Sequence, residues 1–292
     1  MRLFPTWLHP LLSYLIPSNW KSAGYIWQAK KLLVPEILHR RKVMQQKSAN
    51  KKAENAQNLL SWMIECEDGS DPSYLAHLEI VVSLASIHTT QMNIVHVLYD
   101  LAANPEYINQ LREEIQMVAQ RGWNKGSFSQ LLRLDSFLKE SQRFNPPSIL
   151  SMHRIMQQSH QLSDGTELPK GSHICMPVDA IQNDAEITTD PSSFDGLRYF
   201  KMRQAQGERH LHQFATAEKT RLNFGYGKYA CPGRFFASLE IKVILVKLIM
   251  NYDFKLPPQQ GRPQNLMAHE FIFPNPEGKL LFRERGKNFS PF

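Results

Sequence analysis

The chain has 292 residues, 42% hydrophobic and 10% aromatic, enough apolar material for a sizeable core, which excludes a wholly disordered protein. Its 34 Lys and Arg against 27 Asp and Glu give a net charge of +7, a mild excess that suits an acidic partner or an anionic membrane. A nucleic-acid-binding protein would cluster its cations more tightly, so no nucleic-acid partner is expected. Three cysteines, Cys66, Cys175 and Cys231, cannot form a disulfide framework and favour a reducing compartment.

No part of the sequence approaches the ~18 consecutive apolar residues that a membrane-spanning helix requires. The run Leu11–Ile16 is too short, and Pro10 and Pro17 flank it. It also lacks the charged leader and small-residue cleavage site of a signal peptide. We therefore expect no transmembrane segment in this chain.

A basic helix is predicted near the beginning of the chain, within Lys30–Lys52. Leu32, Leu33, Ile37 and Leu38 have the spacing of one buried stripe. The cations of this helix are expected to form a solvated face, with an anion-binding face as the alternative.

A long apolar helix is predicted over Tyr74–Ala103, followed by Asn104 as a cap and Pro105 as the first residue of the next helix. Rising ~1.5 Å per residue, such a helix would cross a whole domain. Further helices are predicted over Pro105–Gln120 and Leu131–Phe144, where Pro146-Pro147 ends the second.

Short strands are predicted in the second half of the chain. The turn dipeptides Asp164-Gly165 and Lys170-Gly171 indicate small β-hairpins. An apolar helix is predicted over Phe235–Met250, and a last hairpin is expected to pair Phe271–Phe273 with Lys279–Phe282. The predicted fold class is mainly α with small β-sheets.

The segment Asn223–Arg234 carries the residues that point to chemistry. Gly225, Gly227 and Gly233 permit positive φ and the close approach of a flat ligand. The proline after Cys231 presets the first turn of a helix, and a helix N-terminus favours a thiolate. A thiolate held in this way is what an axial ligand of haem iron requires. The other two cysteines lack these surroundings and suit inert, buried thiols.

The pattern Phe224-x-x-Gly227-x-x-x-Cys231-x-Gly233 resembles the haem-ligand signature of the cytochrome P450 superfamily. The resemblance implies that Cys231 is the axial ligand of haem b and that Phe224 packs beside it, within a cofactor-binding loop that includes the three glycines. The family usually has Arg or His on a haem propionate where this sequence has Tyr229, which can donate a hydrogen bond but brings no charge. Arg154 is implied to bind a propionate through its guanidinium.

A second motif concerns the structure around this loop. Glu140 and Arg143 lie three residues apart on one predicted helix and resemble the family's Glu-x-x-Arg motif. The resemblance adds Arg198, which follows Phe194 in a Phe-x-x-x-Arg segment, with Gly196 where proline is more usual. A network of these three charged residues is expected to lock the loop that positions Cys231.

The predicted long helix contains Ala85–Thr90, which resembles the oxygen-activating segment of the family. Thr89 is implied to act in oxygen activation and proton delivery, with Ser86 in place of the usual glycine and His88 in place of the usual acid. Histidine can also relay protons near neutral pH. The alternative for His88 is a buried core histidine whose ring nitrogens are hydrogen-bonded. This form of the segment is similar to filamentous-fungal members that modify terpenoid and related secondary metabolites.

The resemblance thus implies a haem-thiolate monooxygenase that oxidises a hydrophobic small molecule, with Ile149, Leu150 and Met152 lining the substrate wall. The implied electron donor is NADPH-cytochrome P450 reductase, docking on the cysteine side, where Lys139, Lys228 and Arg234 are candidate contacts. Family members usually lie at the cytosolic face of the endoplasmic reticulum membrane. Without the anchor, this chain is expected to be cytoplasmic or peripheral.

The resemblance covers nearly the whole chain, but only the C-terminal part of the family fold. We expect one cytochrome P450 domain over 1–292, truncated at the N-terminus, with the front-end helices, most of the first sheet and the membrane anchor missing. Its expected parts are a helical region (1–147), a β-hairpin and meander region (148–222), the haem-thiolate loop and its helix (223–250) and a C-terminal hairpin (251–292). The alternative function is a truncated, inactive haem-binding remnant. A metal site at His210-x-His212 is a weaker alternative.

Overall fold

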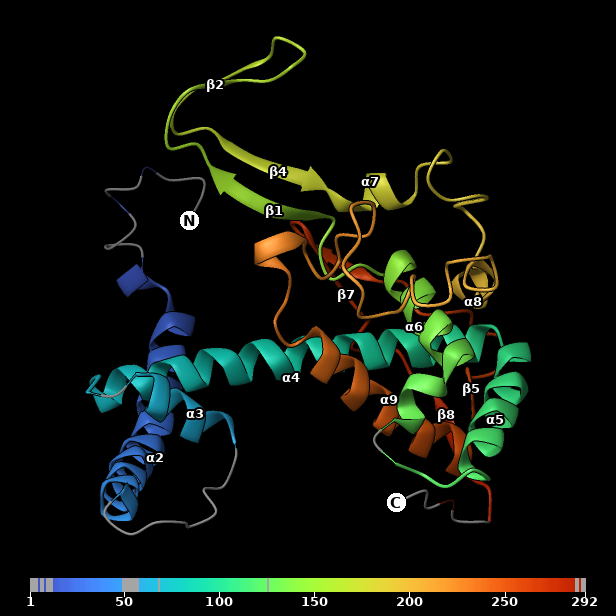
Figure 1. Cartoon of the computed structure of the whole chain (residues 1–292), viewed down its shortest axis with the longest axis horizontal. Coiled ribbons are helices and arrows are strands. Elements are labelled where there is room, and N and C mark those ends of the chain that lie inside the picture. Colours follow the sequence, from blue (N-terminus) through green and yellow to red (C-terminus); the bar gives the residue numbers. More distant parts are fainter. Residues whose placement is uncertain are drawn as a thin grey trace. The chain divides into compact units, whose positions relative to one another are not determined.

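The computed structural model describes residues 5, 8, 13–48, 58–67, 69–124, 126–286 and 289. They divide into two compact units, Met1–Ile87 and His88–Phe292. Helices make up most of the first unit and supply the core of the second, and the strands are short and form two-stranded sheets (Figure 1). The predicted class, mainly α with small β-sheets, is confirmed. No helix in the described ranges is both long and apolar enough to cross a membrane.

The first unit contains α2 (Pro17–Ser48), α3 (Leu59–Cys66) and the beginning of α4 (Pro72–Ala103). Its small core gathers around Ile37, which is fully buried; the other buried members are Leu60, Ile64, Leu75 and Ala76.

The predicted basic helix is longer than expected, because α2 begins at Pro17 and continues through Pro35. Of the four residues predicted to form one buried stripe, two pack against the core and two are exposed. Ile37 and Leu33 contact the core, whereas Leu32 and Leu38 are exposed, because the helical period rotates them away from it. Residues 49–52 of the prediction lie outside the described residues.

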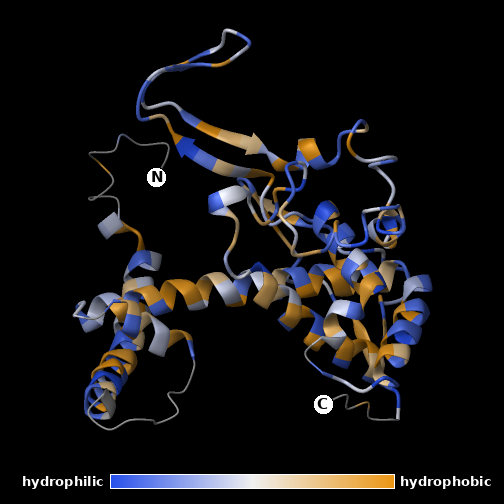
Figure 2. Cartoon of the chain, viewed as in Figure 1, coloured by the Kyte–Doolittle hydropathy of each residue, from blue (hydrophilic) through white to orange (hydrophobic). Residues whose placement is uncertain are grey.

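The second unit has its core where the C-terminal part of α4 meets α5 (Glu106–Ala119), α6 (Leu132–Phe144) and α9 (Arg234–Asn251). Figure 2 shows that α4 is hydrophobic along most of its length. Every residue of α6 from Leu134 to Arg143 is buried, charged ones included. Because burying a charge is costly unless it is paired, α6 requires ionic partners from other segments.

The remaining helices are short: η2 (Ser127–Gln130), α7 (Val178–Gln182), α8 (Arg198–Met202) and η3 (Gly227–Tyr229). The strands are β1 (Leu150–Ile155), β2 (His160–Gln161), β3 (Glu167–Leu168), β4 (His173–Pro177), β5 (Tyr252–Lys255), β6 (Leu266–Ala268), β7 (Phe271–Phe273) and β8 (Leu281–Glu284). β1 pairs with β4 and β2 pairs with β3, both antiparallel. The predicted turns at Asp164-Gly165 and Lys170-Gly171 are confirmed, with Gly165 at φ +87° and Gly171 at φ +88°.

The predicted pairing of the last strands is wrong. β7 pairs with β6 across the turn His269-Glu270, and β8 pairs with β5. The two-residue turn closes a shorter loop than the predicted one at Pro274–Gly278 and costs less chain entropy. β5, the partner of β8, follows α9 directly. It is separated from β8 by β6 and β7, so no local sequence pattern reveals the pairing.

The predicted cap between α4 and α5 is also wrong. The Asn104 side chain donates to the Asp100 carbonyl at 2.8 Å and so closes α4, while Pro105 takes the N-cap position of α5 without a side-chain cap. An asparagine can bond the carbonyl four residues behind it as readily as the amides ahead, and a sequence pattern does not separate the two.

Candidate active site

The loop around Cys231 is held by its own backbone. The Cys231 amide donates to the Phe224 carbonyl at 2.7 Å, and the Gly225 amide donates to the Leu222 carbonyl at 2.8 Å. Gly225 has φ +70°, and a Cβ there would lie 2.7 Å from the Tyr229 carbonyl oxygen, so this turn requires glycine. Helix α9 starts at Arg234 with Gly233 as its N-cap, which places Cys231 just before the helix.

The three thiols differ in exposure. Cys231 is half-buried, whereas Cys66 and Cys175 are exposed. The expectation that these two cysteines are buried is therefore wrong: Cys66 ends α3 and Cys175 lies on β4, and neither position is covered by packing. Phe224 connects the loop to the core, since its ring packs edge-on against buried Phe214 at a centroid distance of 5.2 Å.

Arg154 and Tyr229 lie together, although they are far apart in the sequence. The Arg154 guanidinium carbon is 4.1 Å from the centroid of the Tyr229 ring, a close cation–π contact. One guanidinium nitrogen of Arg154 also donates to the His153 carbonyl at 2.7 Å. The cation of Arg154 thus lies over Tyr229, two residues before Cys231.

Glu140, Arg143 and Arg198 form one ion-pair network. Glu140 is fully buried and accepts from Arg143 at 2.7 and 2.9 Å and from Arg198 at 3.2 Å. The two guanidinium groups also donate to backbone carbonyls between residues 189 and 193: Arg143 to Pro191 and Ser193, Arg198 to Thr189, Asp190 and Ser193. The network therefore connects α6 to this stretch of irregular backbone.

Gly196 stands where the family usually has proline, and the packing explains the difference. A Cβ at Gly196 would lie 2.5 Å from the Phe137 ring and 3.1 Å from the Tyr107 ring. The Gly196 amide also donates to the Tyr107 hydroxyl at 3.2 Å, a bond that proline could not make. An aromatic cluster of Tyr107, Phe137 and Phe194 thus fills the space that a larger residue would need.

The three predicted residues of α4 have different surroundings. Ser86 is exposed, and its hydroxyl donates to the Ser83 carbonyl at 3.1 Å. His88 lines a cavity of about 760 Å³, together with residues of α4, β6, β7 and the segment 274–276. Thr89 is exposed, and its carbonyl accepts from the Asn93 side chain at 2.8 Å.

The predicted substrate wall lies next to the hairpin that lines this cavity. Ile149, Leu150 and Met152 are half-buried on or beside β1. The Ile149 amide donates to the Glu270 carbonyl at 2.8 Å, and Ser148 bridges to Phe271. The structure therefore brings the predicted wall to the β6–β7 hairpin, whose Leu266, Met267, Ala268 and Phe273 line the cavity.

Comparison with known proteins decides the family. A family model described as Cytochrome P450 matches residues 3–282. The chain belongs to the cytochrome P450 family. It is 45% identical over 289 residues to cytochrome P450 monooxygenase AN1598 of Emericella nidulans, covering 98% of this chain and 54% of the relative. It is 40% identical over 291 residues to an ent-kaurene oxidase of Gibberella intermedia, covering 98% and 53%.

The chain therefore spans about half the length of the curated cytochrome P450 relatives it matches. The predicted resemblance to filamentous-fungal members of the family is confirmed. Among solved structures, the retinoic acid-bound cyanobacterial CYP120A1 matches 87% of this chain and 56% of its own length, with a TM-score of 0.67 and 20% identity. This match shows the cytochrome P450 fold.

Haem b is the cofactor of this family, and the residues of the loop fit it. The half-buried Cys231 offers the thiolate, and a Cβ built on Gly227 would meet no atom within 4 Å, so that side of the loop is open. Arg154 offers a cation for a carboxylate. In the described ranges, no group of three or more His, Cys, Asp or Glu side chains could hold a metal ion, so the alternative at His210 and His212 lacks a third ligand there.

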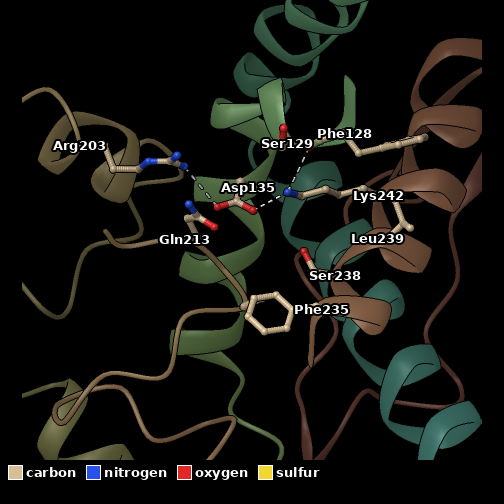
Figure 3. A pocket seen from close by; sticks show the side chains of 10 residues that line it. Phe128, Ser129, Asp135, Arg203, Gln213, Phe235, Ser238, Leu239 and Lys242 are labelled. Atoms are coloured by element: carbon tan, nitrogen blue, oxygen red, sulfur yellow. Dashed lines mark hydrogen bonds and ion pairs between the residues drawn. The ribbon is translucent and has the colours of Figure 1, made fainter. Parts of the chain in front are cut away.

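Two buried ionic clusters of this cytochrome P450 were not predicted from the sequence. Figure 3 shows the first, in which Asp135 lies between Arg203 and Lys242 beside a cavity of about 230 Å³. Asp135 accepts from Lys242 at 2.5 Å and is 3.5 Å from Arg203. The sequence offered only a weak signal, namely that Asp135 lies on the same helix as the motif residue Glu140.

The second cluster surrounds His96 and Asp100 on α4. Arg262 binds Asp100, and a guanidinium nitrogen of Arg262 lies 3.3 Å from His96 Nδ1. Burial, with Arg262 beside it, lowers the pKa of His96 to about 4, and burial raises the pKa of Asp100. A neutral His96 accepts a hydrogen bond from the Arg262 guanidinium at Nδ1, which a protonated ring could not do.

One predicted contact for an electron donor is wrong. Lys139 is buried, and its ammonium pairs with Glu218 at 2.6 Å and donates to the Gln213 carbonyl at 3.1 Å. It lies on the buried helix α6, so it is not available to a partner. Lys228 is exposed, and Arg234 is half-buried with one nitrogen donating to the Cys231 carbonyl.

Proposed function

We propose that this chain provides the haem-binding part of a monooxygenase that oxidises a hydrophobic small molecule, in fungal secondary metabolism, and that 1–292 belongs to one cytochrome P450 domain. The observation that carries the proposal is the Cys231 loop, with a half-buried thiol beside an open glycine surface. Bound haem supplies the oxygen-activating chemistry, because a thiolate ligand increases electron density at the iron.

In this proposal several residues of the chain would hold the cofactor. Cys231 would ligate the haem iron through its thiolate, and Phe224 fixes the loop to the core through Phe214. Arg154, which lies over Tyr229, would bind a propionate. Gly225 and Gly233 shape the turn on either side of the thiol. The network of Glu140, Arg143 and Arg198 has a structural role, because its guanidinium groups hold the backbone of residues 189–193 in place.

The residues of α4 have the proposed catalytic roles. Thr89 would hold a proton at its hydroxyl for oxygen activation, and His88 would pass protons through its imidazole. Ser86 lies about one helical turn before Thr89, and its small side chain leaves space beside the helix. The apolar cavity beside His88 and the wall of Ile149, Leu150 and Met152 exclude water and orient the substrate.

The comparisons support the class of substrate. An ent-kaurene oxidase among the relatives supports an apolar, terpenoid-like substrate. NADPH-cytochrome P450 reductase is the proposed electron donor, with Lys228 as a candidate contact. The proposed place of action is the cytosolic face of the endoplasmic reticulum, with this chain cytoplasmic or peripheral to the membrane.

A carbon monoxide difference spectrum of the reduced protein, produced with a haem precursor, tests the proposal. A strongly red-shifted Soret band, typical of thiolate ligation, is expected. Cys231→Ser should abolish this band, whereas Cys175→Ser, at an exposed thiol, should retain it. Failure to take up haem, or an unchanged band in Cys231→Ser, would refute the assignment of the ligand.

The alternative is a haem-binding chain without activity. Product formation with reductase and NADPH separates the two hypotheses. A thiolate band with product, and with more peroxide release in Thr89→Ala, supports the monooxygenase. A thiolate band without product under any such condition supports the inactive form.

A further inference from the structure

Three segments that lie far apart in the sequence border the proposed substrate site. Helix α4 and the β6–β7 hairpin line the cavity of about 760 Å³, and the predicted wall at residues 149–152 bonds to the turn of that hairpin. β6 and β7 have three residues each. A hairpin so short is only marginally stable by itself, so its position depends on what holds it to the rest of the fold.

Arg262, four residues before the start of β6, binds two buried side chains of α4. Its Nε donates to the Asp100 carboxylate, and its Nη2 lies 3.3 Å from His96 Nδ1. Both of these side chains belong to residues that are 3% exposed, and each directly follows a cavity-lining residue of α4, Tyr99 and Val95 respectively. The guanidinium therefore holds the approach to the hairpin against the cavity-lining part of α4.

The same guanidinium also bonds to the end of α6. Its Nη2 donates to Asn145 Oδ1 at 2.8 Å, and Asn145 is the buried C-cap residue of that helix. Asn145 Nδ2 in turn donates to the Asp100 carboxylate at 3.0 Å. Two prolines follow Asn145 and restrict the backbone that leads to the wall at residues 149–152. The position of Asn145 therefore limits where the wall begins.

Further bonds hold both ends of the hairpin. Arg262 Nη1 donates to Asn265 Oδ1 at 2.9 Å, and Asn265 Nδ2 donates to Asn145 Oδ1 at 2.7 Å, directly before β6 begins. After β7, the Tyr99 hydroxyl donates to the Asn275 carbonyl at 3.0 Å. Arg262 and Asn265 thus hold the first end of the hairpin, and Tyr99 holds the second.

Arginine suits this position because its side chain donates from three nitrogens in one plane. Nε binds Asp100, Nη1 binds Asn265 and Nη2 binds Asn145, so one residue reaches three segments. A lysine could retain the ion pair with Asp100 but has no planar fork to reach the two asparagines. Arg262 is not one of the residues that line the cavity, so it acts through the segments that do.

We propose that Arg262 is a positioning residue that holds α4, the end of α6 and the β6–β7 hairpin in one arrangement and thereby sets the length of apolar ligand that the cavity accepts. The proposal rests on the proposed function, since the ligand is the hydrophobic substrate. Without the guanidinium, the hairpin keeps its backbone bonds to residues 147–149, so the hairpin and the wall shift together at the Arg262 end. The cavity then changes its length, although every residue that lines it is still present.

Hydrogen–deuterium exchange of the full chain, produced with a haem precursor, tests the positioning. Arg262→Gln and Arg262→Lys should speed exchange of the amides in residues 148–152 and 266–273 about tenfold or more, because the loss of one hydrogen bond to a charged group is worth about that factor. Circular dichroism of each variant confirms that the helices are retained.

Arg112→Gln is the matched control. Arg112 is largely buried and likewise bonds to a carboxylate, that of Asp253 at 2.9 Å, and to the carbonyls of Ile249 and Tyr252. It connects α5 to the end of α9 and to β5, which do not line the cavity. This variant should destabilise the fold but leave exchange in residues 266–273 within about threefold of the unchanged chain.

The ligand length is measured on the haem-loaded chain with imidazoles that carry straight alkyl chains of increasing length. The imidazole nitrogen binds the iron and shifts the Soret band, and the alkyl tail occupies the cavity. In the unchanged chain, each added methylene should tighten binding about fourfold until the cavity is full. Both Arg262 variants should change the chain length at which this gain stops, and Arg112→Gln should not.

The proposal is overturned if the Arg262 variants and Arg112→Gln speed exchange in residues 266–273 equally, because Arg262 would then contribute only to global stability. It is also overturned if the gain stops at the same chain length in the Arg262 variants and in the unchanged chain. The exchange measurement reads backbone amides, so it decides this proposal even where the carbon monoxide spectrum refutes the proposed function.

Discussion

Removing the charge of Glu140 tests how much of the stability depends on one buried carboxylate. Glu140→Gln keeps the shape of the side chain but leaves Arg143, which is 1% exposed, without its ionic partner. Breaking a buried ion pair from one side costs ~3–5 kcal/mol, because a desolvated charge remains. At about 2–4 °C per kcal/mol for a chain of this size, the melting temperature should fall by roughly 6–20 °C.

Thermal and urea unfolding, followed by circular dichroism, measure the loss. The matched control is Glu36→Gln, which removes an acid from the exposed pair with Arg40 and should change the melting temperature very little. The reasoning fails if Glu140→Gln unfolds within about 1 kcal/mol of the unchanged chain. Such a result would mean that the carbonyls bound by Arg143 are sufficient partners for its charge.

Three further changes test other parts of the structure. Gly196→Ala should destabilise the fold by about 1–3 kcal/mol in urea unfolding, because its Cβ would overlap the Phe137 ring; Gly261→Ala, where a Cβ meets open space, is the control. The pKa of His96 is lowered to about 4, so the unfolded chain binds a proton that the folded chain does not, and stability should fall as the pH drops from about 6.5 to about 4. His96→Gln should lack this part of the slope, and an equal slope in both proteins would contradict the assignment. Tyr229→Ala should speed haem transfer to apomyoglobin, whereas Tyr229→Phe, which keeps the ring under Arg154, should not; equal rates would show that the stack does not position Arg154.

The parts of the fold that were predictable depend on neighbours in the sequence. The long helix α4 follows from a sustained apolar pattern, and the hairpin at Asp164-Gly165 follows from its turn residues. Glu140 and Arg143 are one helical turn apart, so their pairing needs no knowledge of the rest of the chain. The family motif around Cys231 is equally local, since the glycines and the cysteine lie in one short loop.

The parts that were not predictable join residues that are far apart in the chain. Asp135 meets Lys242, β5 meets β8, and Arg154 lies over Tyr229 across 75 residues of sequence. No local pattern determines such pairs, because many distant partners have the right chemistry. Lys139 shows the consequence, since its charge suggested a surface position, whereas burial of α6 placed it inside with Glu218.

The sequence by itself determined the helical class and the family and singled out the thiol proposed to bind haem, because these depend on residues within a few turns of one another. Only the tertiary structure decided which charges are buried, which strands pair and why residue 196 must be small. Each of these depends on space that distant segments share. The exposed aromatic rings of α2 are another feature that only the tertiary structure decided. The sequence shows that the rings are present, and only the packing shows that they are exposed.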